Sequence, residues 1–386
     1  MEMKEICENI YYVGVNDHQV QLFEGQYPVS HGMSYNSYVI VDQKIAVMDS
    51  VDGHFGKEWL ANIQEVLKDR QPDFLIVQHM EPDHSGCIKE FVDNYPNTTV
   101  VSSNQAFTMM KNYFGTDFAP NKTVVKEGDQ LKLGEHTLKF IGAPMVHWPE
   151  VIVTYETKEK ILFSADGFGK FGALDQEEPW DDEARRYYIG IVGKFGNQVQ
   201  NLLKKASQLD IQMICPLHGP VLKEDLGHYL SLYDTWSGYK VEKDGVLIVY
   251  SSVYGHTKKA AEILKEQLEQ LNTKVEILDL SLVDISEAVS LAFAYGKIVL
   301  ASITYNTDCF AHMKTFLTYL VDRNFQNKTI SLIENGTWMP MAAKAMKKQL
   351  ESAKNIEYVD PIISIKGEIN EEQLLQINEL AKILAK

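Results

Sequence analysis

Apolar and polar positions follow one rhythm up to about residue 240 and a stricter one after it. In the first part, short apolar runs of strand length are interspersed with longer stretches of helical spacing. The polar segment Thr157–Glu159 joins the apolar runs Val151–Tyr155 and Ile161–Ser164, which predicts a hairpin. Hairpins mixed with crossover helices predict two packed sheets with helices outside, an αββα layering. The predicted strands are Ile10–Val15, Ser37–Val41, Ile45–Asp49, Phe74–Gln78, Thr99–Ser102, Leu138–Ile141, Val151–Glu156, Lys160–Ser164 and Ile211–Cys215, and the predicted helices are Lys57–Lys68, Gln105–Phe114, Asp182–Ser207 and Asp225–Tyr239.

The second part begins after the polar segment Glu242–Gly245 and alternates regularly between strand-like and helical segments. Five strands in such alternation predict a parallel doubly wound sheet, in its simplest form with the flavodoxin-like order 2-1-3-4-5. We place the boundary near Lys243, which gives domains at residues 1–242 and 243–386. The predicted strands are Val246–Tyr250, Lys274–Leu278, Ile298–Ser302, Thr329–Ile333 and Ile362–Ile365, and the predicted helices include Lys258–Leu271 and Met341–Ala353.

The densest group of potential metal ligands follows a predicted buried strand. The apolar run Phe74–Val77 leads directly to His79, Glu81, Asp83 and His84. Residues two apart in an extended chain point the same way, so donors at the end of a strand can converge on one point. Imidazole and carboxylate together suit borderline to hard transition metals. A solvated loop is the alternative, but four donors within six residues favour a metal site.

Three more donors each follow a predicted strand in the first part of the chain: His147, Asp166 and His218. A single histidine after a strand is more often structural than a ligand. Together with the upstream cluster, however, the chain offers seven donors, about what two metals with a bridging carboxylate need. Asp166 lies between two histidine segments and is the natural bridge. Asp49, at the end of its strand, is expected instead to accept hydrogen bonds that support the fold.

Composition narrows the class of protein. The chain of 386 residues is 45% hydrophobic and 23% charged, as is usual for soluble globular proteins of two domains. A net charge of −16 disfavours nucleic-acid binding. No run of transmembrane length and no signal peptide are recognised, so we expect a cytoplasmic protein with no membrane partner. The cysteines are far apart, which argues against a disulfide framework, a zinc ribbon or a rubredoxin module: Cys7, Cys87, Cys215 and Cys309.

A candidate phosphate site follows the first strand of the second part. Hydroxyl side chains and backbone N–H groups at the start of a helix form a ready phosphate site. The loop lacks the lysine of a nucleotide P-loop and the glycines of a dinucleotide fingerprint, so it suits a monophosphate such as that of FMN. A tight turn without a ligand would also use Gly and Ser. The candidate FMN-binding residues here are Ser251, Ser252, Tyr254, Gly255, His256 and Thr257.

Two further loops follow the third and fourth strands, where an open α/β sheet binds its ligand. Each carries an aromatic residue, Tyr305 in the first and Trp338 in the second, that could flank the flavin ring. Each aromatic alone could be a packed surface residue, but three loops in register favour a flavin site. The candidate residues are Ser302, Thr304, Tyr305 and Asn306, then Asn335, Gly336, Thr337 and Trp338.

The spacing of the metal donors resembles the metallo-β-lactamase fold, whose hydrolases carry a histidine at the third motif position and usually bind zinc. This chain has Glu81 there, and the added negative charge favours a harder ion such as iron(III). With this departure and the flavodoxin-like second part, the sequence resembles the A-type flavodiiron proteins over essentially its full length. The resemblance implies that His79, Glu81 and His147 bind one iron. Asp83, His84 and His218 would bind the second iron and Asp166 would bridge, although in some members the histidine matching His84 does not coordinate.

The resemblance also implies an oxidoreductase that reduces O2 to water or NO to N2O. Electrons would come through FMN from rubredoxin, a similar carrier or a small reduced deazaflavin. A head-to-tail homodimer, or a dimer of such dimers, would bring the FMN of one chain next to the irons of the other. Tyr187 or Tyr188 could donate a hydrogen bond to the bound diatomic, or could simply pack in the core. Several relatives carry a histidine in the early loop where this chain has Phe23–Tyr27.

Other functions remain open at this point. A dizinc hydrolase with an accessory flavodoxin is the main alternative, and Glu81 argues against it. A non-catalytic FMN electron carrier is a third, which the seven metal donors argue against. Five lysines on helices after the flavin loops could dock an acidic donor or could be an ordinary solvated face: Lys258, Lys259, Lys344, Lys347 and Lys348.

Overall fold

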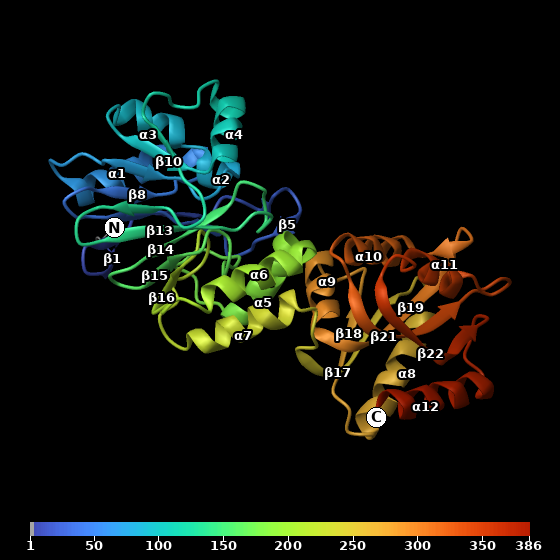
Figure 1. The fold of residues 1–386 in the computed structure, drawn as a ribbon. Helices are drawn as coiled ribbons and strands as arrows, with labels where there is room; N and C mark the ends of the chain where they lie inside the picture. Colours follow the sequence, from blue (N-terminus) through green and yellow to red (C-terminus); the bar gives the residue numbers. More distant parts are fainter. Residues whose placement is uncertain (1–3) are drawn as a thin grey trace. The chain divides into compact units, whose positions relative to one another are not determined.

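The computed structural model describes residues 4–386, which form two compact units (Figure 1). The first, here called the N-terminal unit, comprises the chain up to Tyr188 together with Asn197–Tyr233. The second, the C-terminal unit, comprises Ile189–Gly196 and Asp234–Lys386. The domain limits 1–242 and 243–386 stay a prediction. Among the described residues, no helix is both long and apolar enough to cross a membrane.

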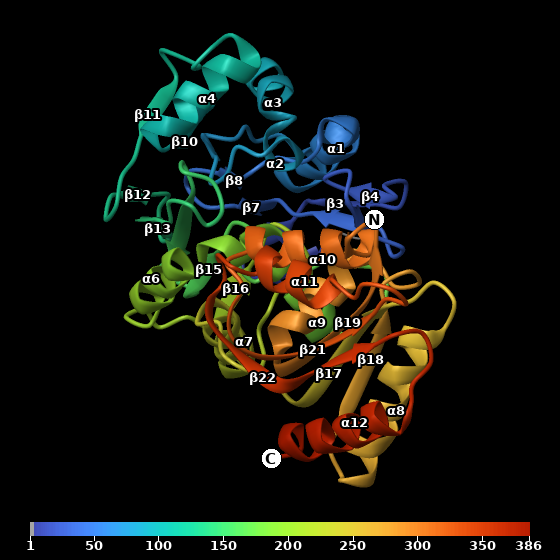
Figure 2. The same ribbon diagram turned by 90° about the vertical axis from the view of Figure 1, so that its right-hand side faces the viewer.

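Two sheets pack face to face in the N-terminal unit. One core cluster contains Met48 and Ile76 from the first sheet and Phe140 and Phe163 from the second, which shows that their apolar faces meet. Helices α1, α3 and α4 cover the outer side of the first sheet (Figures 1 and 2). The predicted αββα layering is therefore confirmed. The first sheet has the order β1 (Lys4–Cys7), β2 (Ile10–Tyr12), β7 (Tyr38–Ile40), β8 (Ala46–Met48), β9 (Phe74–Ile76), β10 (Thr99–Ser102), β11 (Lys122–Val124), and the second β12 (Gln130–Lys132), β13 (Thr137–Gly142), β14 (Ile152–Glu156), β15 (Ile161–Phe163), β16 (Met213–Cys215).

Short elements and helices complete this unit. Two small hairpins pair β3 (Val15–Asp17) with β6 (Met33–Tyr35) and β4 (Leu22–Phe23) with β5 (Tyr27–Pro28). The helices are η1 (Gly53–Phe55), α1 (Gly56–Leu67), α2 (Pro82–Ser85), α3 (Ile88–Asn94), α4 (Asn104–Phe114), α5 (Trp180–Tyr187), α6 (Gly196–Ala206) and α7 (Leu226–Ser237).

The C-terminal unit is a parallel sheet with the strand order β18-β17-β19-β21-β22, which is the predicted order 2-1-3-4-5. Residues of α8 and α12 form one core cluster with the sheet, and α9, α10 and α11 lie on the other face (Figure 2). The elements are β17 (Lys243–Ser251), α8 (His256–Gln270), β18 (Val275–Asp279), α9 (Ile285–Ala294), β19 (Tyr295–Tyr305), β20 (Asp308–Cys309), α10 (Ala311–Asp322), β21 (Gln326–Asn335), α11 (Ala342–Gln349), β22 (Lys354–Ile365) and α12 (Glu371–Leu384).

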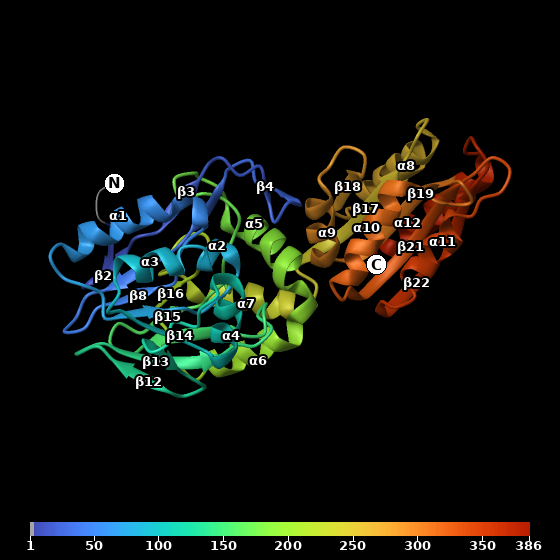
Figure 3. The same cartoon turned by 90° about the horizontal axis from the view of Figure 1, so that it is seen from above.

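Glycines interrupt two elements that the sequence pattern predicts as continuous. The predicted helix Asp182–Ser207 is wrong as a single helix, because a π turn at Tyr188–Val192 and a 3-10 turn at Gly193–Phe195 separate α5 from α6. The chain changes direction between these helices (Figure 3). A Cβ at Gly196 would come within 2.4 Å of the Ser237 carbonyl oxygen, so the chain packs too closely there for any other residue. The predicted strand Ile10–Val15 is likewise split, since a Cβ at Gly14 would lie 2.4 Å from the Tyr35 carbonyl oxygen.

A buried lysine lies in the core of the C-terminal unit. Lys328 on β21 is 3% exposed, and its Nζ donates hydrogen bonds of 2.6 Å to the carbonyl oxygens of Phe293 and Tyr295. Burial lowers the pKa of Lys328 to about 7, although the charge of Glu242 acts in the opposite direction. A neutral amine has two N–H groups, which matches the two carbonyl acceptors.

Because the pKa of Lys328 is lower in the folded state, the protein should become more stable as pH rises above 7. Below pH 7 Lys328 is protonated in both the folded and the unfolded state, so the folded state bears the full free-energy cost of burying the charge. Above it the folded state releases the proton while the unfolded state keeps it up to about pH 10.4. The free energy of unfolding of the wild type, measured with urea, should therefore rise relative to that of Lys328→Met by roughly 1 kcal/mol per pH unit between pH 7.5 and 9.5. The exposed Lys354→Met should show no such trend, and a flat difference for Lys328→Met would contradict the prediction.

Candidate metal centre and flavin pocket

The seven predicted metal donors lie just beyond the ends of four strands. β13, β15 and β16 run in the same direction, because β13 and β15 are both antiparallel to β14 and β16 is parallel to β15. His147, Asp166 and His218 follow these strands and so emerge at one edge of the second sheet. The other four donors follow β9 of the first sheet. Glu81 is the residue before α2, and Pro82 fixes the first turn that carries Asp83 and His84.

The donors form two groups that share a carboxylate. In the first group, Glu81 Oε2 lies 3.2 Å from His79 Nε2 and 3.0 Å from His147 Nε2. Asp166 Oδ2 lies 3.3 Å from His79 Nε2 and 3.1 Å from His147 Nε2. The ligand atoms of these four residues all lie within 4.8 Å of one another.

The second group consists of Asp83, His84 and His218. The Nε2 atoms of the two histidines are 2.9 Å apart, and Asp83 Oδ2 lies 3.3 Å from each of them. Asp166 Oδ1 turns towards this group, at 3.4 Å from His84 Nε2 and 4.0 Å from His218 Nε2. Asp166 therefore presents one oxygen to each group, which is the arrangement a bridging carboxylate requires.

Unsatisfied polar atoms indicate that these residues fit a pair of cations. Both oxygens of Asp83 and both of Asp166 are buried without a hydrogen-bond partner among the described residues. A buried carboxylate without compensation costs several kcal/mol, so these oxygens need a cation or a proton between them. All four imidazoles direct Nε2 into the same space. Imidazole with three carboxylates suits iron.

In the protein alone, protons on the imidazoles offset part of the carboxylate charge. Burial by itself would lower the pKa of His147, but the adjacent carboxylates of Asp166 and Glu81 raise that pKa to about 9. For Glu81 burial would raise the pKa, and the neighbouring His147 and His79 hold it well below its usual range instead. Metal ions would replace these protons, since bound imidazoles must be neutral.

Contacts outside the seven donors fix the histidine rings, and sequence reasoning missed them. Glu150 Oε1 accepts hydrogen bonds from His79 Nδ1 at 2.9 Å and from the Met80 N–H at 2.8 Å. The carbonyl oxygen of Ser34 accepts one from His218 Nδ1 at 2.7 Å. Each bond leaves Nε2 free for a metal. The only signal in the sequence was a carboxylate, Glu150, directly before an apolar strand.

The early loop brings a further carboxylate to the metal centre. Glu24 begins the turn between β4 and β5 with φ +49°, and its carboxyl group lies close enough to Glu81 for the two negative charges to repel each other. Burial, together with the charge of Glu81, raises the pKa of Glu24 to about 7. Glu24 thus occupies the loop in which several relatives carry a histidine.

The two predicted tyrosines differ in their surroundings. The Tyr187 ring centroid lies 5.4 Å from that of His218, and burial together with the charge of Asp166 raises the Tyr187 pKa well above its usual range. Tyr188 packs its ring against Tyr233, with centroids 5.1 Å apart. A catalytic role for either residue stays a prediction. Asp49 accepts hydrogen bonds from Gln78 N at 2.6 Å and Gln78 Nε2 at 2.9 Å, as expected of a residue that supports the fold.

A cavity of about 330 Å³ lies at the carboxyl ends of the strands in the C-terminal unit. Three large aromatics on its wall are exposed: Trp338 (89%), Tyr254 (85%) and Tyr305 (52%). Helix α8 starts beside it without a side-chain cap, and the buried Ser251 Oγ has no hydrogen-bond partner in residues 4–386. Uncapped N–H groups next to flat apolar rings fit a phosphate joined to an aromatic ring system.

The structure places ten of the fourteen predicted flavin residues on this cavity: Ser252, Tyr254, His256, Thr257, Thr304, Tyr305, Asn335, Gly336, Thr337 and Trp338. Four do not line it. Ser251 and Ser302 face each other at the ends of β17 and β19, and Gly255 and Asn306 form turns with φ +91° and +48°. Sequence reasoning missed Gly367, which lines the cavity and pairs its N–H and carbonyl with the Asn335 side chain at 3.0 Å each.

Comparisons with known proteins identify the family. Residues 33–219 match the family described as ODP family beta lactamase, and residues 247–377 match a flavodoxin domain. A nitric oxide reductase of Moorella thermoacetica is 30% identical over 98% of this chain and 97% of its own. The chain belongs to the flavodiiron proteins. It is therefore an oxidoreductase, and a flavodiiron protein uses FMN and a diiron site, which the two sites described above fit.

Solved structures agree with this assignment. The flavodiiron protein of Giardia intestinalis is 28% identical and superposes with a TM-score of 0.92 over 100% of this chain and 96% of that one. A rubredoxin oxygen:oxidoreductase of Desulfovibrio gigas, 24% identical, gives the same TM-score over 100% of this chain and 98% of its own, and shows the shared fold.

The contacts of Glu150 predict that its charge matters for metal retention. In Glu150→Gln one oxygen can still accept the His79 proton, but the negative charge that raises the ligand's basicity is lost. Iron affinity should fall roughly 10- to 100-fold, measured by competition with a ferrous chelator. The exposed Glu65→Gln on α1 should bind iron as the wild type does. An unchanged affinity in Glu150→Gln would show that its charge has no part in holding the metal.

Proposed function

We propose that this protein reduces NO to N2O and O2 to water, with electrons passed from an external donor through FMN to two irons. The overall reactions are 2 NO + 2 e⁻ + 2 H⁺ → N2O + H2O and O2 + 4 e⁻ + 4 H⁺ → 2 H2O. The observation that carries the proposal is that one chain contains two His–carboxylate groups sharing Asp166 and a cavity lined by exposed aromatic rings at the start of α8. The 30% identity to a nitric oxide reductase supports NO as a substrate.

Specific residues would hold the cofactors. His79, Glu81 and His147 would bind one iron, Asp83, His84 and His218 the other, and Asp166 would bridge them. Once bound, the irons would supply two adjacent redox-active positions for a diatomic, and FMN would deliver electrons. Around them, Glu150 and the Ser34 carbonyl keep the His79 and His218 protons on Nδ1.

Other residues of the pocket would bind the diatomic and hold the flavin. Tyr187 keeps its hydroxyl proton, because its pKa is raised, and could donate it in a hydrogen bond to the diatomic. In the C-terminal unit, Ser252, His256 and Thr257 would contact the FMN phosphate, and Tyr305 and Trp338 would flank the ring. The proposed domain limits are 1–242 and 243–386, and the proposed assembly is a head-to-tail homodimer.

One preparation tests this proposal. The protein, with iron and FMN quantified, is reduced anaerobically and then challenged with NO and with O2 separately, while its mass is measured by sedimentation. We expect two irons and one FMN per chain, a dimer, and turnover of both gases to N2O and water. Glu81→Ala should lose at least about 90% of turnover with either gas while keeping FMN, because one iron loses its only unshared carboxylate. A zinc-loaded protein with hydrolase activity, or a turnover unchanged by Glu81→Ala, would contradict the proposal.

The contacts of the five lysines suggested by the sequence support a smaller docking surface for an acidic donor such as rubredoxin. Of the five lysines suggested by the sequence, Lys259 pairs with Glu368 at 3.2 Å and Lys258 with Glu262 at 3.7 Å. Lys347 lies over the Tyr358 ring at 4.7 Å. Lys344 and Lys348 are exposed and line a cleft of about 530 Å³. We propose that these two lysines attract the donor.

Neutralising them tests this idea through the salt dependence of electron transfer. In Lys344→Gln/Lys348→Gln the second-order rate of reduction by rubredoxin should fall roughly five- to tenfold at 10 mM salt, because steering by opposite charge is lost. At 0.5 M salt the variant and the wild type should converge. Lys265→Gln, a lysine of α8 near Glu269, serves as the control. Equal rates at both salt concentrations would exclude this docking surface.

A further inference from the structure

The loop between β13 and β14 carries two residues of the metal centre, His147 and Glu150. It begins at Ala143, whose N–H donates to the Val151 carbonyl at 2.9 Å, and it closes on itself through Met145 N to Trp148 O at 2.7 Å. Met145 has φ +63°, a left-handed conformation that costs energy for a residue other than glycine. Such a loop keeps one shape only if its base is held firmly.

The other edge of β13 is completed by side chains instead of a strand. Up to Phe140 the partner is backbone: Gly128 N donates to Phe140 O at 2.9 Å, and Phe140 N donates to Asp129 O at 3.0 Å. Two residues on, Gly142 presents its N–H and carbonyl at this same edge. The N–H donates to Glu127 Oε2 at 2.8 Å, and the carbonyl accepts from Lys205 Nζ at 2.8 Å.

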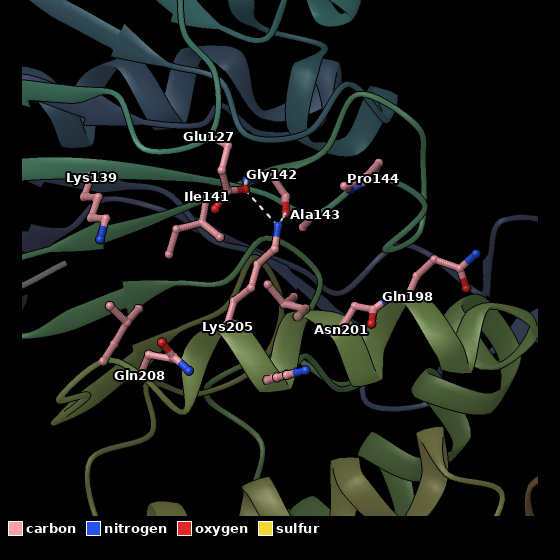
Figure 4. A pocket seen from close by; sticks show the side chains of 13 residues that line it. Glu127, Lys139, Ile141, Gly142, Ala143, Pro144, Gln198, Asn201, Lys205 and Gln208 are labelled. Carbon is pink, nitrogen blue, oxygen red and sulfur yellow. Dashed lines mark hydrogen bonds and ion pairs between the residues drawn. The ribbon is translucent and has the colours of Figure 1, made fainter.

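Glu127 and Lys205 also pair with each other, with Oε2 and Nζ 2.8 Å apart, so three bonds close around one residue, Gly142. Lys205 comes from α6, far along the chain, and ties this helix to the end of β13. The three groups lie at the wall of a cleft of about 740 Å³ (Figure 4). Both side chains are about half exposed, so the ion pair itself is worth at most about 1 kcal/mol. Its effect lies in satisfying the backbone of Gly142 at the last rung of the strand.

We propose that Glu127 and Lys205 are positioning residues for the metal centre, which hold Gly142 and thereby fix the loop that carries His147 and Glu150. The link to iron rests on the proposed function, whereas the link to the loop does not. Removing Lys205 frees the Gly142 carbonyl and leaves Glu127 without its cation. The loop then opens more often, and the iron held by His147 dissociates faster.

Hydrogen exchange on the iron-loaded protein tests the loop directly. In Lys205→Met, amides of residues 143–151 should exchange about three- to tenfold faster than in the wild type, the range expected for the loss of one hydrogen bond. Lys204→Met is the matched control, because Lys204 is the preceding residue of α6 and lines the same cleft; this variant should leave exchange unchanged. Lys205→Arg, which can still donate to the Gly142 carbonyl, should restore most of the protection.

Iron transfer to a ferrous chelator is the second readout. One of the two irons should leave faster in Lys205→Met, and neither should in Lys204→Met. If Lys205→Met does not fold, Glu127→Gln replaces it: its amide oxygen can still accept from Gly142 N, and exchange should rise by a smaller factor. Exchange of residues 143–151 equal to wild type in Lys205→Met, or in Glu127→Gln where that variant replaces it, would overturn the proposal. A protein that never contains iron would refute the proposed function and leave the exchange result intact.

Discussion

The N-terminal unit depends on balancing the charge of carboxylates that the fold buries where its two sheets end. Asp83 and Asp166 lie 8% and 1% exposed, with none of their oxygens hydrogen-bonded in the described part of the chain. A packed core does not tolerate such anions unless positive charge stands beside them. Four imidazoles surround them, and the raised pKa of His147 shows how strongly the carboxylates hold protons there. The buried negative charge that keeps protons on the imidazoles in the protein alone also makes the pocket suitable for two cations.

Sequence alone picked out the seven residues that the structure brings together, because each follows an apolar run and a strand end is a property of neighbouring residues. It also predicted the order of the parallel sheet, since βα alternation leaves few topologies. Sequence reasoning missed Glu150 because its contact with His79 spans 71 residues and is created by the packing of two sheets. Sequence reasoning missed Glu24 because its proximity to Glu81 brings together two segments that are far apart in the sequence. The helix predicted across residues 182–207 failed because apolar spacing continues through Gly190, Gly193 and Gly196, whereas the need for a close backbone approach at Gly196 appears only in three dimensions.

The flavin pocket shows a different limit of sequence reasoning. A loop motif in the sequence locates a segment near the ligand, but it does not tell which of its side chains point into the cavity. Ser251 and Ser302 are paired at the last rung of β17 and β19, and the alternation of a strand turns them into the core beside the cavity. Gly367 comes from beyond the fifth strand, in a segment that carries no motif, and reaches the cavity through its bonds to Asn335. The strongly exposed rings of Trp338 and Tyr254 give the cavity an apolar wall that suits a flat aromatic ligand.

The candidate metal centre is assembled from the ends of four strands in two sheets. The positions of its side chains therefore depend on the backbone hydrogen bonds that hold the end of each strand. Carboxylates just outside the donor set strengthen these rungs by accepting backbone N–H groups. Asp49 takes the N–H of Gln78, one residue before His79, and Glu150 takes that of Met80, one residue after it. Glu127 takes that of Gly142, at the start of the loop to His147. Each of these bonds joins segments distant in sequence, so the position of an imidazole is fixed by a backbone that is itself held from another element. Acidic residues therefore serve this unit in two ways, one set lining the candidate metal site and the other holding the backbone next to the candidate ligands.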